Sequence, residues 1–223
     1  MDTQIESTNL TGCLSSRTWL FFVLLSVWML LAHSRCNAQG TLYTDRSIFD
    51  AALQSGTTIT FAGLPDPPPG IGRSPITVSG VTFTNHSARL FTGSGYLWNF
   101  DSSYPVGVFL PGGNNAFAAD FSGGIDPQNN PFNGTLTFTL LDGQVFTHNF
   151  TGQVGSWFFL GFTFSQPIRN LVYSDGGPFL PGAHEEMLDN VTFGVAVPEP
   201  QISLLALFGL FHAFRLARLR KQV

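Results

Sequence analysis

The chain has 223 residues, of which only 11% are charged, 14% are aromatic and 23 are phenylalanine. A chain this apolar and aromatic is not intrinsically disordered, and its length fits one ordinary domain with short appendages. The formal net charge is −4, but between Gln39 and Val197 four arginines stand against eleven acidic residues. This acidic middle excludes nucleic acid as a partner, because phosphates need a basic surface.

Residues 1–38 have the features of a secretory signal peptide. The segment from Trp19 to Ala32 contains a single polar side chain, and Cys36 and Ala38 occupy the small positions of a cleavage site. A membrane anchor is the alternative, but this segment would rise only about 21 Å as a helix, against a hydrocarbon core of about 30 Å. Cleavage after Ala38 would remove both cysteines, Cys13 and Cys36, so the mature protein would have neither a disulfide nor a cysteine metal site.

A short helix is predicted at the start of the domain, in the segment "YTDRSIFDAALQSG". Thr44 is the expected N-cap, and Gly56 is expected to end the helix. Ile48, Ala52 and Leu53 form the face that we expect to point inward.

The rest of residues 39–196 has the pattern of an all-β domain. Ser79-Gly80 is a two-residue hairpin signal between β-rich segments, and Asp142-Gly143 is expected to turn the chain back into a strand over Val145 to Phe150. Leu136, Phe138 and Leu140 alternate with threonines, which places them on the core face of a strand. The spacing of these segments predicts a jelly-roll-like two-sheet β-sandwich with one short N-terminal helix. Further strands are predicted over Thr57 to Phe61, Arg89 to Thr92, Val106 to Phe109, Ala116 to Phe121, Ser156 to Phe164, Ile168 to Ser174 and Met187 to Val195.

The segment "GYLWNF" suggests a binding surface for sugars. Tyr96 and Trp98 lie on one side of a strand, and Leu97 lies on the other. If Leu97 points inward, both rings lie outside and form a platform on which a sugar stacks. If it does not, both rings belong to the core.

The search for reactive groups favours a protein without catalytic activity. "HEEML" has Leu188 where a zinc-protease helix needs its second histidine, and no nucleophile accompanies a histidine elsewhere. Loop carboxylates and amides leave a structural calcium ion as the one candidate cofactor, because calcium prefers such oxygen ligands. Asp189 and Asn190 are the preferred calcium ligands.

The last segment, residues 197–223, has the features of a sorting and anchoring tail. Pro198 and Pro200 hold an extended joint around Glu199, since proline fits neither a helix interior nor a central strand. Ile202 to Phe214 is an apolar run of about 20 Å as a helix, which predicts a weak membrane-anchor helix. A basic cluster follows and predicts a cytoplasmic stop-transfer signal: Arg215, Arg218, Arg220 and Lys221.

This order of Pro-Glu-Pro, apolar run and basic end resembles the PEP-CTERM sorting tail of exported proteins in bacteria with an outer membrane. The resemblance covers the last 27 residues, from Val197 to Val223. It implies an exosortase as partner, a membrane protease-transpeptidase that removes the tail near Pro198, Glu199 and Pro200. A lipid-type GPI tail is the alternative, but such a tail ends in apolar residues and this one ends in charge.

We therefore expect an exported, non-enzymatic protein of the cell surface or extracellular matrix. Its tail would hold it transiently in the inner membrane until processing. One alternative is a carbohydrate-binding module acting on matrix polysaccharide, which predicts exposed aromatic rings beside polar side chains. The other is a secreted hydrolase, which predicts acidic or histidine side chains that converge in a cleft.

Overall fold

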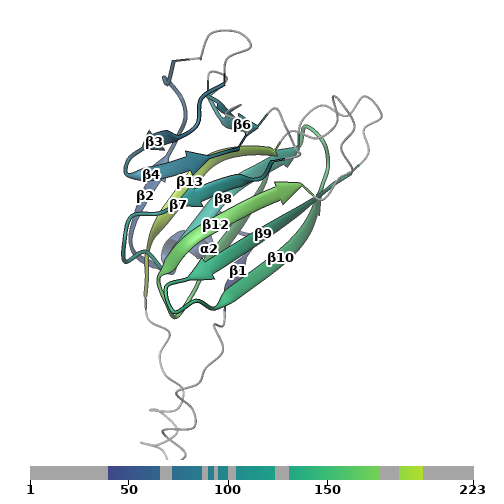
Figure 1. Ribbon diagram of the computed structural model, residues 1–223. Coiled ribbons are helices and arrows are strands. Elements are labelled where there is room, and N and C mark those ends of the chain that lie inside the picture. Colours follow the sequence, from purple (N-terminus) through teal and green to yellow (C-terminus); the bar gives the residue numbers. More distant parts are fainter. Residues whose placement is uncertain are drawn as a thin grey trace, which may run out of the picture. The chain divides into compact units, whose positions relative to one another are not determined.

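The computed structural model describes residues 40–65, 72–86, 90–92, 95–99, 104–123, 131–175 and 186–197. All of them belong to one of the chain's two compact units, Ala38–Val223. They form two antiparallel β-sheets that face each other, with one short helix outside the pair (Figure 1). The predicted all-β, two-sheet architecture with a single short helix is thus confirmed. The predicted signal peptide and C-terminal tail lie outside the described residues.

The first sheet, sheet A, has seven strands. They are β1 (Thr41–Tyr43), β2 (Leu53–Ile59), β5 (Leu90–Phe91), β6 (Leu97–Asn99), β8 (Ala116–Gly123), β11 (Phe158–Thr163) and β13 (Glu186–Ala196). Their order is β1-β11-β8-β13-β6-β5, and β2 also pairs with β13. The pairing of β13 with β8 shifts register between Asp189 and Thr192, which marks a β-bulge.

The second sheet, sheet B, has six strands. They are β3 (Ile76–Val78), β4 (Val81–Thr84), β7 (Val106–Phe109), β9 (Phe132–Leu140), β10 (Val145–Gly152) and β12 (Ile168–Asp175). Their order is β10-β9-β12-β7-β4-β3. Both predicted hairpins are present, β3–β4 and β9–β10. Ser79 and Gly80 both have positive φ, 49° and 81°, as a turn that matches the twist of its strands requires.

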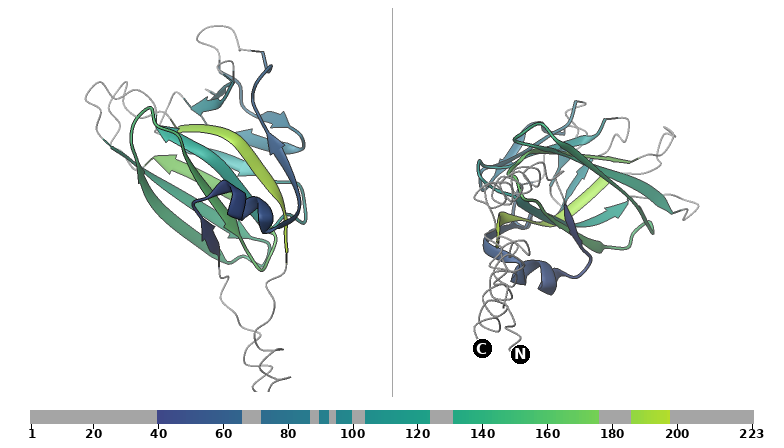
Figure 2. Two further views of the ribbon diagram at one scale, coloured as in Figure 1. Left: turned by 180° about the vertical axis from the view of Figure 1, so that it is seen from behind. Right: turned by 90° about the horizontal axis from the view of Figure 1, so that it is seen from below.

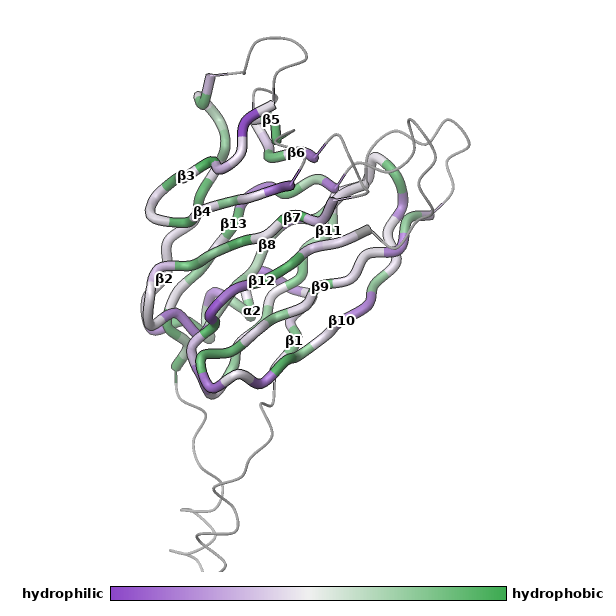
Figure 3. Tube along the Cα trace, viewed as in Figure 1, coloured by the Kyte–Doolittle hydropathy of each residue, from purple (hydrophilic) through white to green (hydrophobic). Residues whose placement is uncertain are grey.

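The apolar core fills the space between the two sheets. Leu136, Phe138 and Leu140 of β9 are fully buried, as their alternation predicts. Phe138 meets Phe117 of β8 across the core, with 6.0 Å between the ring centroids. Along β9, apolar residues alternate with more polar ones (Figure 3). One continuous cluster of buried side chains from both sheets therefore holds the layers together.

The helix α2 (Arg46–Ala51) lies against the outer side of sheet A, as the view from behind in Figure 2 shows. Asp45 is its N-cap, because its carboxylate accepts hydrogen bonds from the backbone N–H groups of Ser47 and Ile48 at 2.8 and 3.2 Å. The predicted cap Thr44 and end Gly56 are therefore wrong. The helix is shorter than expected, and Gly56 lies within strand β2.

The inward face of the helix also differs from the prediction. Ile48 is 60% exposed, whereas its neighbour Phe49 is fully buried. Phe49 lies over Gly161 of β11, where a Cβ would come within 2.6 Å of the Phe49 ring. Ala116, Ala118 and Phe49 share one small buried cluster. Small residues on the sheet thus leave a space that a single aromatic side chain fills.

The described chain enters and leaves the sandwich at one end. Thr41, the first residue of β1, pairs with Thr163, the last residue of β11. Ala196 ends β13 on the same side, two residues beyond the pairing of Gly194 with Ala116. Gly40 and Val197 therefore lie at the same end of sheet A (Figure 1).

Candidate functional site

The outer face of sheet A is divided into three zones from one end to the other. The helix covers the end where the chain enters. A polar cluster occupies the middle and an aromatic cavity the opposite end. The polar cluster comprises Arg46, Asp120, Asp189, Asn190 and Thr192. The cavity is lined by Tyr96, Ser122, Gly123, Val154, Gly155, Trp157 and Met187.

Two aromatic rings flank the cavity, which has a volume of about 230 Å³. The Tyr96 and Trp157 rings meet edge to face, with 5.4 Å between centroids and an interplanar angle of 65°. Trp157 remains 44% exposed and Tyr96 is half-buried. Edge-to-face contact is a preferred geometry for aromatic pairs, so each ring stabilises the position of the other.

A turn before β11 places Trp157 at the cavity. Gly155 has a φ of 72°, a conformation that glycine adopts readily. Its N–H donates to the carbonyl oxygen of Gly123 on β8 at 3.1 Å. The N–H of Ser156 donates to the carbonyl oxygen of Gln153 at 3.1 Å and closes the turn. The first bond holds the turn against the end of β8, and the second fixes the shape of the turn itself.

The two residues predicted as a sugar platform, Tyr96 and Trp98, each pack on a different aromatic ring and not on each other. Leu97 is buried, so Tyr96 and Trp98 lie on the outer side of β6, as the first of the two sequence readings requires. Trp98 is half-buried and packs on Phe91 of β5, with ring centroids 4.8 Å apart. Tyr96 instead pairs with Trp157. Trp157 was not predicted at this surface, because no local sequence pattern indicates that the residues preceding β11 and β6 come together.

Arg46 organises the polar cluster. Its guanidinium donates to Asp120 Oδ1 at 2.7 Å and to Thr192 Oγ1 at 3.3 Å. It also lies over the Phe159 ring, 4.5 Å from the centroid. The side-chain amide of Asn190 donates to Asp120 Oδ2 at 2.7 Å. Both oxygens of Asp120 thus accept hydrogen bonds from the protein.

The predicted calcium ligands Asp189 and Asn190 belong to this cluster. Asn190 has a φ of 46° at the bulge of β13, and its N–H donates to Asp189 Oδ1 at 2.7 Å. Burial raises the pKa of Asp189, and the charge of Asp120 adds to this effect. Arg46 already supplies positive charge here. No group of three or more His, Cys, Asp or Glu side chains that could hold a metal is found among the described residues.

A second polar cluster, which the sequence analysis did not anticipate, lies buried between the sheets. Asn85 follows β4 of sheet B, and Asn99 and Glu186 belong to sheet A. The Asn85 amide donates to Asn99 Oδ1 at 2.8 Å, and both amides donate to the carbonyl oxygen of Tyr104 at 2.7 Å. Asn99 also donates to the Glu186 carboxylate. These bonds join the two sheets near the start of β13.

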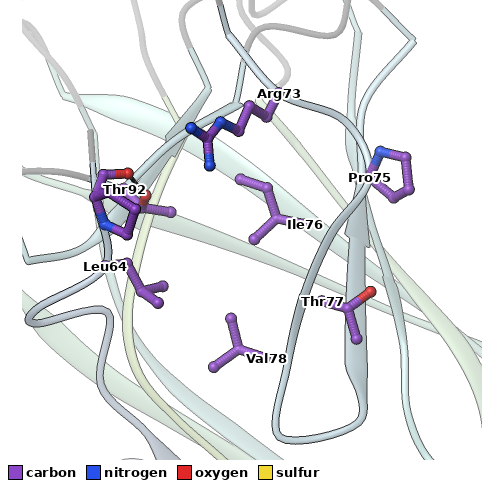
Figure 4. A pocket seen from close by; sticks show the side chains of 8 residues that line it. Leu64, Arg73, Pro75, Ile76, Thr77, Val78 and Thr92 are labelled. Carbon is purple, nitrogen blue, oxygen red and sulfur yellow. Dashed lines mark hydrogen bonds between the residues drawn. The ribbon is translucent and has the colours of Figure 1, made fainter. Parts of the chain in front are cut away.

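Another cavity of about 230 Å³ opens where β3 meets the segments next to β2 and β5. Leu64, Ile76 and Val78 point toward a common space, and Arg73 extends above Ile76 (Figure 4). Pro65 and Thr92 also line this space, and the Thr92 hydroxyl donates to the carbonyl oxygen of Pro65 at 3.4 Å. Arg73 is the single charged residue in the lining, and the walls carry no aromatic ring.

The predicted sorting and anchor residues lie outside the described part of the chain. They are Pro198, Glu199, Pro200, Arg215, Arg218, Arg220 and Lys221. Within the described ranges, no helix is both long and apolar enough to cross a membrane.

The chain was compared with protein families, with curated proteins and with solved structures. No family model matches the chain, and neither the curated proteins nor the solved structures contain a match.

Proposed function

We propose that this chain is an exported, non-catalytic β-sandwich protein that binds a polysaccharide of the cell surface or extracellular matrix. The observation that carries the proposal is the edge-to-face pair of Tyr96 and Trp157 beside an open cavity. The binding function is the alternative that the sequence left open, and it is now supported by a specific site.

The chemistry of the cavity suits a sugar ring. A pyranose has apolar C–H faces that pack on aromatic rings and a rim of hydroxyl groups that need hydrogen-bond partners. Trp157 and Tyr96 offer the rings. Ser122 lines the cavity but is only 1% exposed, and its hydroxyl donates to the carbonyl oxygen of Gly123 at 3.4 Å. Asp189 lies two residues along β13 from Met187, about 7 Å away, and offers a carboxylate. A cavity of 230 Å³ is smaller than the roughly 300–1,000 Å³ of drug-sized pockets, so it fits a single sugar unit.

Hydrolysis is the second candidate, because Asp120 and Asp189 are directly opposite each other on β8 and β13. Retaining glycosidases use a carboxyl pair about 5–5.5 Å apart, with one member free to attack. Here both oxygens of Asp120 accept hydrogen bonds, from Arg46 and Asn190. That engagement favours binding over hydrolysis.

Substitution of Trp157 tests the proposal. Polysaccharides from the native matrix are titrated against the exported protein, and bound ligand is measured by affinity electrophoresis. Trp157→Ala is expected to weaken binding at least tenfold, about 1.4 kcal/mol, because the stacking face is lost. Phe109→Ala is the matched control, since Phe109 is 46% exposed on sheet B and does not line the cavity. Equal binding by both variants would overturn the proposal, and release of reducing ends would favour the hydrolase.

Export and sorting are proposed on the residues of the two chain ends. Pro198, Glu199 and Pro200 would be the exosortase recognition element, and the apolar run with its basic end the transient membrane anchor. The intact mass of the protein from the native envelope tests this. Loss of about 38 residues in front and roughly 25 behind is expected from signal and tail processing. A mass that retains Arg215 to Val223 would overturn the sorting proposal.

The connectivity supports the finer prediction of a jelly roll. From β7 onward the chain changes sheet at each connection, apart from the β9–β10 hairpin. Such repeated crossing between two sheets is typical of a jelly roll. We therefore propose this topology for the domain.

A further inference from the structure

Strand β10 (Val145–Gly152) is an edge strand of sheet B. All eight of its residues pair with β9, without a register shift. Among the described residues, no strand pairs with its other side. The backbone N–H and C=O groups of that side are therefore available to another strand.

Natural proteins protect such edges, and β10 has none of the usual protection. Lys, Pro, β-bulges and short length are the common devices. The other edge strands use them: β1, β3 and β5 have only two or three residues, and the register between β2 and β13 shifts next to Ala196. Val145 to Gly152 contains no Lys, Arg, Asp, Glu or Pro. It is the one long, regular and uncharged edge in the described part of the chain.

The inward side chains of β10 are incompletely covered. Phe146, His148 and Phe150 point toward the core and contact the Phe162 or Phe158 ring of β11. All three are only half-buried, whereas the inward residues of the neighbouring strand β9 are fully buried. Val145 at the start of the strand is 62% exposed. Apolar surface thus remains open along this edge.

The sequence of β10 is complementary to itself in one antiparallel register. If a two-fold axis perpendicular to the sheet passes midway between His148 and His148 of a second copy, Phe146 faces Phe150 of that copy and Thr147 faces its Asn149. The alternation of the strand then keeps every inward side chain on the core side in both copies. This register also pairs the strand over nearly its full length.

We propose that two copies of this chain associate through antiparallel β10–β10 pairing about His148, so that two sheets B become one continuous sheet. The uncharged edge lets two acidic domains approach without placing like charges opposite each other. On the outer face, Thr135 donates to Asn149 at 2.9 Å and Thr151 to Asn133 at 2.8 Å. A Thr147–Asn149 pair across the axis would extend this ladder.

Engineered cysteines test the register. In the full chain, Cys13→Ser and Cys36→Ser leave no other thiol. His148→Cys is expected to give a disulfide-linked dimer on mild oxidation, because the two Cα atoms at the axis would be about 4.5–5.5 Å apart, within disulfide range. Val145→Cys is the control, since its side chain is more exposed but faces Thr151 of the second copy. Equal cross-linking at both positions, or none at His148→Cys, would overturn the proposal.

A charge on the edge tests the association independently of cysteine chemistry. Thr147→Lys should shift the full chain in mild detergent from dimer to monomer, as measured by light scattering after size exclusion. Thr137→Lys, on the outer face of the inner strand β9, should leave the dimer intact. Circular dichroism confirms that both variants fold. A monomeric unmodified protein, or a dimer that persists in Thr147→Lys, would overturn the proposal and leave the polysaccharide site unaffected.

Discussion

Asp189 shows how one residue couples the polar cluster to pH. Burial and the charge of Asp120 hold the pKa of this carboxyl above its usual 3.8, although the Asn190 N–H and Arg46 oppose the effect. The folded state therefore binds the Asp189 proton more tightly than the unfolded state does. As pH rises from 3.8 through the higher folded pKa, Asp189 lowers the free energy of unfolding.

Asp189→Asn removes this contribution while it keeps an oxygen for the Asn190 N–H. We expect the variant to be more stable than the natural protein at pH 7 and to lose that advantage at pH 3, where Asp189 is protonated. Urea unfolding at the two pH values measures this. An advantage that is the same at both would show that Asp189 does not titrate in this way.

Gly194 illustrates a residue whose lack of a side chain is required. A Cβ at this position would overlap the carbonyl oxygen of Ser55 and lie 2.8 Å from the Cα of Gly56. Backbone atoms cannot move aside as a flexible side chain can. Gly194→Ala should cost about 1–3 kcal/mol of stability, and thermal unfolding measures the loss. Gly112→Ala is the matched control, because no atom lies within 4 Å of its added Cβ.

Some residue positions were predictable and others were not. The burial of Leu136, Phe138 and Leu140 follows from a period of two, which is a local property. The outward direction of Tyr96 follows from the same rule once Leu97 is buried. The contact between Tyr96 and Trp157 depends on the order of four strands in sheet A. No local pattern contains that order.

At the scale of elements, two adjacent residues of helix α2 are expected to contribute very differently to stability. Phe49 is fully buried between α2 and sheet A, whereas Ile48 is 60% exposed. Phe49→Ala should cost about 3–5 kcal/mol, because it leaves a cavity over Gly161. Ile48→Ala should change stability by less than about 0.5 kcal/mol. Chemical denaturation of both variants checks the pair, and similar losses would contradict the observed direction of the helix.

The elements that the sequence predicted best are those with strong turns or strict alternation. β7 begins and ends at Val106 and Phe109, as expected, and both hairpins are present. The predicted helix is longer than the observed one, because Ala52 and Leu53 fit a helical period as well as the start of a strand. β1 has only three residues, too few for a periodic pattern.

At the scale of the whole molecule, a single core predicts a single unfolding transition. The main cluster takes buried side chains from both sheets, and the Asn85–Asn99–Glu186 network also joins them. Neither sheet can therefore lose its partner and stay folded. The transitions seen by circular dichroism and by fluorescence of Trp98 and Trp157 should coincide. Separate midpoints would show that the sheets unfold independently.

The pairing of distant strands is the part of the fold that sequence reasoning could not reach. Alternation shows which face of β13 is buried, but not that β8, β6 and β2 are its neighbours. Those pairings join residues more than sixty positions apart, such as Leu188 and Phe121. Packing of the complete core decides them, and the cavity on sheet A depends on that result.

The two ends of the described chain and the aromatic cavity lie at opposite ends of the sandwich. Gly40 and Val197 lie at one end, and the aromatic cavity lies at the other, about 20 Å away along β11. A protein fastened through either end would therefore hold its cavity away from the point of attachment. Many copies fastened to one surface would each keep the cavity at the end of the sandwich opposite the attached chain end.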